Sequence, residues 1–351
     1  MHFPPSSRSR ALELVAGALL LCSCSSETTA PPSQNDFASQ FDAVWSKYDS
    51  TYPYFDYKHV NWDSLRTVYR ARAVAATSEQ ELANVVRDML GQLRDVHSWL
   101  IAPNGSSVST YSPPAFVNWR SDVWQSYVRG YGWQQQQTNW GYGRVGGIPY
   151  FVFGAWNTAQ FNAAAVDAAL EQFKNAPALI IDVRMNGGGN SSLADSIAAR
   201  FFDSTRVATY VRYRTGPMHT DFGALQAARV SPRGAWQFRK PVLLLIGRGC
   251  FSSNEEFIAA MSQLPNVTVV GDTTGGGSGN PAMFDLGGGW QYSVPRWIEY
   301  TAAMQIVEWK GIAPSIVVPT KAADFDAGID PVLEYAARWA TTVQGQRVTQ
   351  N

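Results

Sequence analysis

The sequence is short of the features that mark nucleic-acid binders and membrane-spanning proteins. Its 28 Lys and Arg balance 28 Asp and Glu, so the net charge is +0, and charged residues make up only 16% of the 351 positions. With no excess of positive charge and no basic stripe, nucleic acid is disfavoured as a partner. The apolar run at residues 12–21 is too short to cross a bilayer.

Cysteine is also scarce, with three in the chain: Cys22, Cys24 and Cys250. Because the first two fall in an export segment, an intramolecular disulfide and a zinc site built on several cysteines are excluded in the body. We interpret Cys250 as a buried, small apolar residue; a rival nucleophile is the alternative. The glycine-rich stretches contain neither Gly-x-Gly-x-x-Gly nor Gly-Lys-Ser/Thr, so no cofactor and no metal is expected.

Residues 1–24 have the pattern of a bacterial export signal. Arg8 and Arg10 precede the short apolar run, which ends in Leu-Cys-Ser-Cys. This resembles the lipoprotein box Leu-x-small-Cys and predicts Cys24 as the lipidated residue, with ordinary secretion as the alternative. Residues 25–35, rich in Ser, Thr, Pro and Gln, predict a flexible tether. We therefore expect a lipoprotein of the bacterial cell envelope, attached to the membrane by its lipid.

Residues 36–101 predict a helical region. Apolar residues recur at helical spacing in three stretches that begin near Phe37, Trp62 and Ser78. After the third stretch the pattern shifts towards alternation, so His97 lies where a helix gives way to a strand. A lone histidine is most often a hydrogen-bonded core residue, and that alternative stands beside any catalytic role.

Residues 102–351 predict an α/β core. Two short apolar runs, at 178–182 and 241–246, suit strands that are buried on both faces. Three glycines, residues 187–189, follow the first strand and would let backbone amides face a cleft; a tight turn into the next helix is the alternative.

Ser252 and Ser253 follow the second strand, where a helix is expected to begin. Both fit the capping-box spacing, Ser252 with Glu255 and Ser253 with Glu256, so either could merely cap the helix. Alternatively, a serine lifted off the strand end points into a cleft. The amides that open the helix would then bind a developing anion.

Four further expectations concern the topology. Residues 141–153 predict a hairpin that turns at two glycines, and residues 330–341 predict a closing helix. Residues 103–137 and 215–236 are polar and predict loops. Residues 308–314 predict the entry to a strand.

Five segments follow one another along the chain: Leu93-Arg-Asp95-Val-His97 and residues 182–189, 252–257, 270–277 and 308–314. In this order they resemble motifs of the C-terminal processing (tail-specific) serine peptidases, closest to the tricorn-core and interphotoreceptor-retinoid-binding-protein-like branch. One alone would be weak, but five in family order are a strong signal. The resemblance implies a crotonase- or Clp-protease-like core of ββα units preceded by a helical region. The family's usual PDZ domain is absent, since residues 103–141 are too few for it.

The resemblance also implies an enzyme that hydrolyses polypeptides. The loop at 275–279 lacks the lysine of the Ser/Lys enzymes, so histidine is the expected base. His97 matches the family's catalytic histidine and Glu308 matches the carboxylate that orients it. The expected set is Ser252 as nucleophile, His97 as general acid/base and Glu308 holding the imidazole.

For the oxyanion hole, the resemblance implies the backbone amides of Ser253 and Gly188. One departure is Val96, which stands where tricorn-like enzymes have a serine. Ser98 follows the histidine instead, on the opposite side of an alternating strand. Lys310, placed on the same strand face as Glu308, is an alternative base or a partner for that carboxylate.

Two other functions remain open at this stage. The aromatic residues between Trp119 and Trp140 suit a non-catalytic protein that binds apolar ligands or peptides on the same fold. Crotonase-type acyl-CoA chemistry is disfavoured by the export signal, because CoA is cytosolic. The sequence leaves the oligomeric state open.

Overall fold

The computed structural model describes residues 36–113, 116–157, 159 and 162–348. The expected signal and tether, with Cys24, lie outside these residues. The chain divides into two units, Met1–Asp36 and Phe37–Asn351, and every element below belongs to the second. Within the described ranges, none of the helices combines the length and the apolar character that a bilayer crossing requires.

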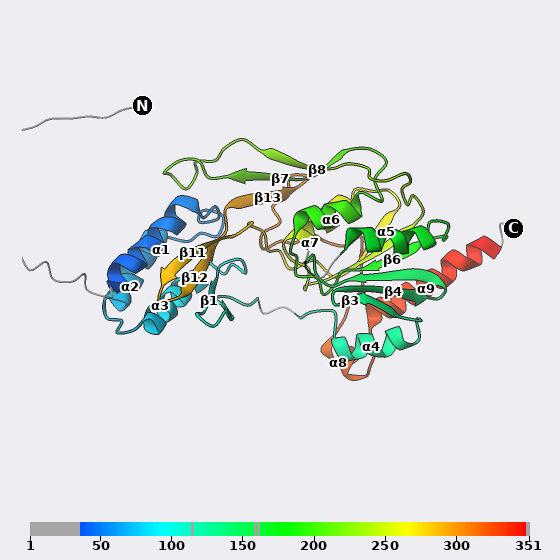
Figure 1. The fold of residues 1–351 in the computed structure, drawn as a ribbon, viewed down its shortest axis with the longest axis horizontal. Helices are drawn as coiled ribbons and strands as arrows, with labels where there is room; N and C mark the ends of the chain where they lie inside the picture. The colour runs from blue at the N-terminus through cyan, green and yellow to red at the C-terminus, as the bar shows by residue number, and fades with distance from the viewer. Residues whose placement is uncertain (1–35, 114–115, 158, 160–161, 349–351) are drawn as a thin grey trace, which may run out of the picture. The chain divides into compact units, whose positions relative to one another are not determined.

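Three helices open the described chain, as expected: α1 (Phe37–Thr51), α2 (Trp62–Val74) and α3 (Glu79–Gly91). Side-chain caps fix the starts of the last two, because Asn61 accepts a hydrogen bond from the Ser64 amide and Ser78 from the Glu81 amide. Their apolar faces gather into one core with a sheet built from distant parts of the chain (Figure 1).

That sheet has four antiparallel strands in the order β11-β12-β1-β2. The strands are β1 (Trp99–Ile101), β2 (Ser107–Ser109), β11 (Ala282–Gly287) and β12 (Trp290–Val294). Leu100 pairs with Tyr292, and both belong to the core beneath the helices. This core therefore takes residues from both sides of the expected boundary at 101/102.

The largest sheet has seven strands in the order β14-β10-β9-β6-β5-β4-β3. The pairs from β14 to β5 are parallel, and β4 and β3 are antiparallel additions. The bounds are β14 (Ile316–Val317), β10 (Val267–Gly271), β9 (Val242–Ile246), β6 (Leu179–Asp182), β5 (Ile148–Phe153), β4 (Trp140–Val145) and β3 (Gln134–Gln137).

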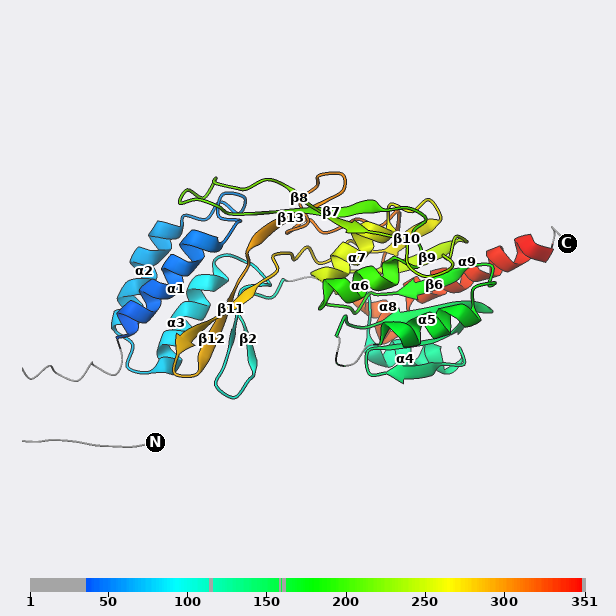
Figure 2. The same cartoon turned by 45° about the horizontal axis from the view of Figure 1, so that its top comes forward.

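Helices cover both faces of this sheet (Figures 1 and 2). One face packs against α5 (Ala163–Gln172), α6 (Ser191–Ala198) and α7 (Ser253–Met261), and the other against α4 (Ser121–Arg129) and α9 (Pro331–Val348). Strand β9 explains the arrangement: Leu244 enters one core while Leu243 and Leu245 enter the other. A continuous apolar run is what a strand covered on both sides requires, so this prediction is confirmed.

A third, three-stranded sheet has the order β13-β7-β8. It consists of β7 (Arg206–Tyr213), β8 (Gln226–Val230) and β13 (Trp297–Thr301), all antiparallel. Strand β13 matters for the site because its middle residue, Glu299, is only 1% exposed. A short helix, α8 (Ala322–Asp326), precedes the closing helix α9.

Three local expectations are wrong. Residues 103–137 contain α4, β3 and β2, and residues 215–236 contain β8, where loops were expected. The three strands are short and polar and lack a clear apolar alternation, whereas α4 does have an apolar face, with Val123 and Val128 buried, that the loop expectation missed. Glu308 and Lys310 lie in a turn rather than on one strand face, and Trp309 between them has a φ of 65°. The hairpin, the buried strands and the closing helix are confirmed.

Candidate active site

Ser252 lies at the junction of β9 and α7, in a strained backbone conformation with φ 57° and ψ −136°. Its amide donates to the Gly277 carbonyl (2.9 Å), and its own carbonyl accepts from the Glu255 amide (2.6 Å). Positive φ at a residue with a Cβ persists only where the surroundings enforce it, and here both peptide groups are held. The Ser252 side chain makes no capping hydrogen bond, so the helix-cap interpretation is wrong for this residue.

His97 lies in the turn between α3 and β1. Its amide donates to Asp95 Oδ1 (2.8 Å), and its carbonyl accepts from Ser293 Oγ (2.8 Å). The residue is 7% exposed, and within the described chain its Nδ1 has no hydrogen-bond partner. Burial lowers the pKa of the imidazole below 6.5, with Lys58 acting in the same direction and Asp95 against it. The ring is thus neutral at neutral pH and able to accept a proton.

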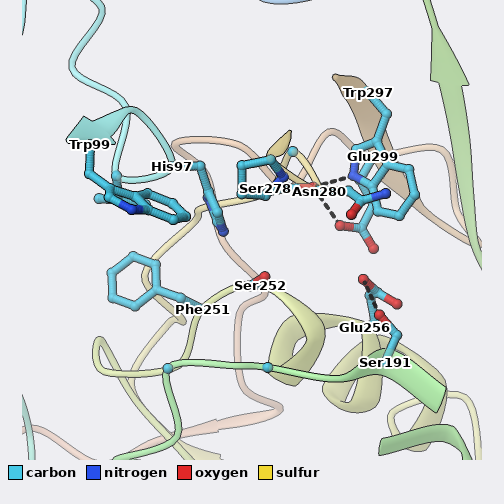
Figure 3. Close-up of a pocket in the computed structure, with 15 residues that line it drawn as sticks. His97, Trp99, Ser191, Phe251, Ser252, Glu256, Ser278, Asn280, Trp297 and Glu299 are labelled. Atoms are coloured by element: carbon cyan, nitrogen blue, oxygen red, sulfur yellow. Dashed lines mark hydrogen bonds between the residues drawn. The ribbon is translucent and has the colours of Figure 1, made fainter. Parts of the chain in front are cut away.

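The two side chains share a pocket of about 530 Å³. Figure 3 shows the imidazole of His97 pointing towards the hydroxyl of Ser252. No hydrogen bond joins them in the described part of the chain, as is common before substrate binds. The lining residues are Val96, His97, Trp99, Gly187, Gly189, Ser191, Phe251, Ser252, Glu256, Ser278, Gly279, Asn280, Pro281, Trp297 and Glu299.

Glu308 is buried, but it does not contact His97. Its carboxylate binds Lys58 Nζ (2.5 Å) and the Ser278 amide (3.0 Å). The hydrogen bond from the imidazole to Glu308 that the sequence predicts is not present among the described residues, and the carboxylate is paired with Lys58 instead.

Lys58 joins Glu308 to Asp95, whose Oδ2 lies 2.8 Å from Nζ and 2.7 Å from the Tyr52 hydroxyl. All three charged side chains are fully buried. Burial and the charge of Asp95 raise the pKa of Glu308 to about 8. Burial acts to raise the pKa of Asp95 too, but Lys58 and His97 hold it below its usual value. One lysine thus stabilises an ionised Asp95, which in turn holds the backbone of His97.

The two amides expected in the oxyanion hole differ in availability. The Gly188 amide donates to Asn186 Oδ1 (2.8 Å), so it is already occupied. The Ser253 amide, the first of α7, has no acceptor among the described residues. Gly188 nevertheless lies directly against the nucleophile: a Cβ there would meet Ser252 Cβ at 2.7 Å, and its φ is 107°.

Comparisons with known proteins show which family and fold this chain resembles. The profile of peptidase family S41 matches residues 152–318, and that of the tricorn protease C1 domain matches residues 33–91. The carboxy-terminal processing protease CtpA of Bacillus subtilis (strain 168) is 30% identical over 161 residues, 45% of this chain and 32% of that protein. The match to the S41 family model thus covers just under half of the chain. The family resemblance seen in the sequence is confirmed, although the chain spans only about a third of CtpA.

Solved structures share the fold of this chain. A candidate peptidase from Parabacteroides merdae ATCC 43184 is 28% identical with a TM-score of 0.77, covering 87% of this chain and 97% of its own. The photosystem II D1 C-terminal processing protease is 14% identical (TM-score 0.52; 86% and 98% covered). The tricorn protease is also 14% identical (TM-score 0.57; 88% and 37% covered). The mixed α/β architecture of the family is thereby confirmed.

Several residues near Ser252 and His97 could not be found from the sequence. Lys58 has no motif around it, and Glu299 looks like one polar residue on a strand. Glu256 was read only as a capping partner of Ser253, whose Oγ is buried without any partner among the described residues. That second cap interpretation is therefore also wrong. Their proximity to Ser252 comes from chain folding, so no local signal marks them.

The other candidate residues from the sequence take no part in the pocket of Ser252 and His97. The Cys250 thiol is buried, donates to the Val183 carbonyl (3.2 Å) and has a pKa raised by burial, so the apolar interpretation is confirmed. His219 pairs with Asp49 (2.9 Å), outside the pocket. Lys310 is exposed, and Ser98 is buried without lining the pocket.

Proposed function

We propose that this chain is a cell-envelope serine peptidase that cleaves polypeptides through an acyl-enzyme. One observation carries the proposal: Ser252, on a strained turn that frees its hydroxyl, shares a pocket with His97, which is neutral. The match to the family S41 model and the likeness to a carboxy-terminal processing protease support a polypeptide substrate.

The first step is a proton transfer from Ser252 to His97 that accompanies the attack on the substrate. His97 takes the hydroxyl proton of Ser252 as Oγ attacks the scissile carbonyl carbon, and the carbonyl oxygen becomes an oxyanion. His97 then gives the proton to the leaving amine. The C–N bond breaks, and an ester to Ser252 remains. Water repeats the sequence, with His97 again as base, and releases the acid product.

The oxyanion is stabilised by the Ser253 amide at the start of α7. Gly188 supplies the second donor once Asn186 Oδ1 releases its amide, a change that a bound carbonyl can induce by competing for the same N–H. Losing one such donor typically raises the barrier by about 3 kcal/mol.

Glu308 acts as a positioning residue in this proposal, through two contacts. It accepts from the Ser278 amide, next to Gly277, whose carbonyl holds the amide of Ser252. It also binds Lys58, which fixes Asp95 beneath His97. In the proposed Ser/His/Glu set, Glu308 is therefore linked to the backbone of His97 through Lys58 and Asp95.

We also propose a core type, the domain boundaries and a lipid anchor. A crotonase-like core without a PDZ domain is supported by the parallel sheet covered on both faces and by the few residues between β2 and α4. We assign residues 1–24 to a lipoprotein signal with Cys24 lipidated, 25–35 to a tether, 36–101 to the helical region and 102–351 to the peptidase core. A Streptococcus agalactiae structure described as a lipoprotein shares the fold (16% identical, TM-score 0.58).

A fluorophosphonate probe tests the nucleophile. We expect the wild-type protein to be labelled at Ser252 and Ser252→Ala not to be labelled; labelling that persists in this variant contradicts the assignment. Palmitate incorporation in cells tests the anchor, and Cys24→Ala should abolish it. The binding-protein alternative gains no support from the structure, because Trp124 and Trp133 pack together beside a cavity of only about 120 Å³.

A further inference from the structure

Two carboxyl groups lie in the same pocket as Ser252 and His97, and the mechanism uses neither. Glu256 comes from the first turn of α7, and Glu299 comes from the middle of β13. Figure 3 shows the two side chains pointing towards one another across the pocket, beside the Ser252 hydroxyl. They are brought together by different elements, so their approach is a feature of the tertiary structure.

Glu299 is held firmly but left partly unpaired. Its Oε2 accepts from Ser278 Oγ (2.5 Å), and Trp297 Nε1 lies 3.3 Å from that hydroxyl. Its Oε1 is buried and accepts no hydrogen bond in the described part of the chain, although the Thr209 hydroxyl is close enough to act towards lowering the pKa of the carboxyl. The residue is 1% exposed. A buried acceptor without a donor is costly, typically by about 1–3 kcal/mol, so the site is built to receive a donor.

Glu256 supplies the second carboxyl group, and the fold provides it with little hydrogen bonding to offset its burial. Ser191 Oγ lies 3.4 Å from its Oε1, and Asp195 stands nearby on α6. Burial and Asp195 raise the pKa of Glu256 to about 7, and burial and Glu256 raise that of Glu299. The third acid of this cluster, Glu255, is already satisfied by Thr274 and two loop amides.

Positive charge is missing from this surface. None of the described residues that line the pocket is a lysine or an arginine. Nor do the described residues contain a group of three or more metal-ligating side chains, so a metal ion has too few ligands here. The pocket therefore presents two acids, one free buried oxygen and no counter-ion next to the nucleophile.

We propose that Glu256 and Glu299 form a subsite for a lysine or arginine side chain of the polypeptide substrate, next to the bond that is cleaved. The ammonium or guanidinium group donates to Glu299 Oε1 and to Glu256, and its charge favours ionisation of both acids. The apolar stem of the side chain lies along Trp297 and Pro281. This subsite rests on the proposed peptidase function and adds a substrate class to it.

The test uses matched peptide pairs that differ at one position: lysine against norleucine, and arginine against its neutral isostere citrulline. Binding is measured by calorimetry to the full chain carrying Ser252→Ala, so that no turnover is needed. Cleavage by the wild-type chain is followed by mass spectrometry, which also locates the cut bond. We expect roughly tenfold or greater preference for the charged member in both assays, with cuts beside the basic residue.

Two substitutions examine the carboxyls separately. Glu299→Gln and Glu256→Gln, each also placed in the Ser252→Ala background, should reduce the charged-to-neutral ratio towards one. Glu171→Gln, a change at an exposed helical glutamate, should leave the ratio unaltered. Glutamine keeps the size and an acceptor oxygen, and two independent variants guard against misfolding of one.

The outcomes separate the subsite from the catalyst. Equal binding of charged and neutral peptides, or a preference that survives both glutamine substitutions, overturns the subsite. If the wild-type chain reacts with a fluorophosphonate at Ser252 while showing no basic preference, the peptidase stands and the subsite falls. If Ser252 is unreactive but lysine peptides bind tenfold better, the subsite stands and the catalytic proposal fails.

Discussion

Two clusters of acids lie near His97 and Ser252, and they differ in one respect. Behind the histidine, Asp95 and Glu308 share a buried lysine, Lys58, at 2.8 and 2.5 Å. In the pocket, Glu256 and Glu299 face one another, and no described lining residue carries a positive charge. The first cluster is complete within the fold. The second becomes complete only when a cation arrives, which is the difference between a structural support and a binding site.

Replacing Lys58 should leave both clusters without a positive charge. Of the changes considered, this one should have the largest effect on stability. Lys58→Met leaves the ionised Asp95 buried without a counter-ion, and we expect a loss of about 3–5 kcal/mol in the free energy of unfolding. Denaturant titration measures it. Lys310→Met, at an exposed lysine, is the control and should change stability by less than about 0.5 kcal/mol. A neutral result for Lys58→Met would mean that the network does not support the site.

The acids of the pocket should make the stability of the protein depend on pH. The pKa of Glu256 is raised to about 7, above its value in the unfolded chain, so the folded state binds more protons between these pKa values. The contribution of Glu256 to the free energy of unfolding is therefore largest at low pH and falls as the pH rises. We expect the folded state to lose about 2 kcal/mol from this source between about pH 5 and pH 8. Glu256→Gln should flatten that slope in thermal melts; an unchanged slope would contradict the uncompensated pocket.

The same titration should govern the substrate preference. Below about pH 7 the Glu256 carboxyl is largely protonated, so the preference for lysine over norleucine should shrink from about pH 8 to about pH 6. Rates of cleavage of the matched peptides at each pH measure the ratio. A ratio that stays constant over this interval would argue against Glu256 as a ligand of the basic side chain.

Glu308 and Asp95, the two acids that contact Lys58, should lose different amounts of stability when each is replaced by its neutral amide. With a pKa of about 8, Glu308 carries a proton at neutral pH, so Glu308→Gln should cost less than about 1 kcal/mol there. Asp95 is ionised, and Asp95→Asn should cost distinctly more. Urea titration of both variants at about pH 7 makes the comparison. Equal losses would mean that Glu308 is charged in the folded state.

The smallest expected effect is a shift in the acid limb of activity. The wild-type limb should have its midpoint below 6.5, because burial lowers the pKa of His97. Lys58 also lowers that pKa, so Lys58→Met should move the midpoint upward, whereas Glu299→Gln should leave it in place because Glu299 is not among the charges acting on His97. The pH profile of kcat/KM measures both.

Much of the fold could be predicted because its signals are local. The apolar run of β9 and the helical spacing of α7 lie within a few turns of chain and identify a buried strand followed by a helix. The strand β3, Gln134–Gln137, could not be predicted, since four glutamines have no apolar alternation. Its partner β4 alone makes it a strand. Glu308 was misplaced for a similar reason, because the positive φ of Trp309 has no marker in the sequence.

By itself, the sequence determined that a serine follows a buried strand, that a histidine ends a helical region and that both belong to motifs of one family. Those facts are carried by residues close together in the chain. Only the tertiary structure decided that Lys58 reaches Glu308, 250 positions away, and that Glu256 and Glu299 meet in one pocket. The partner of a buried charge depends on which elements pack together, and packing depends on the whole chain.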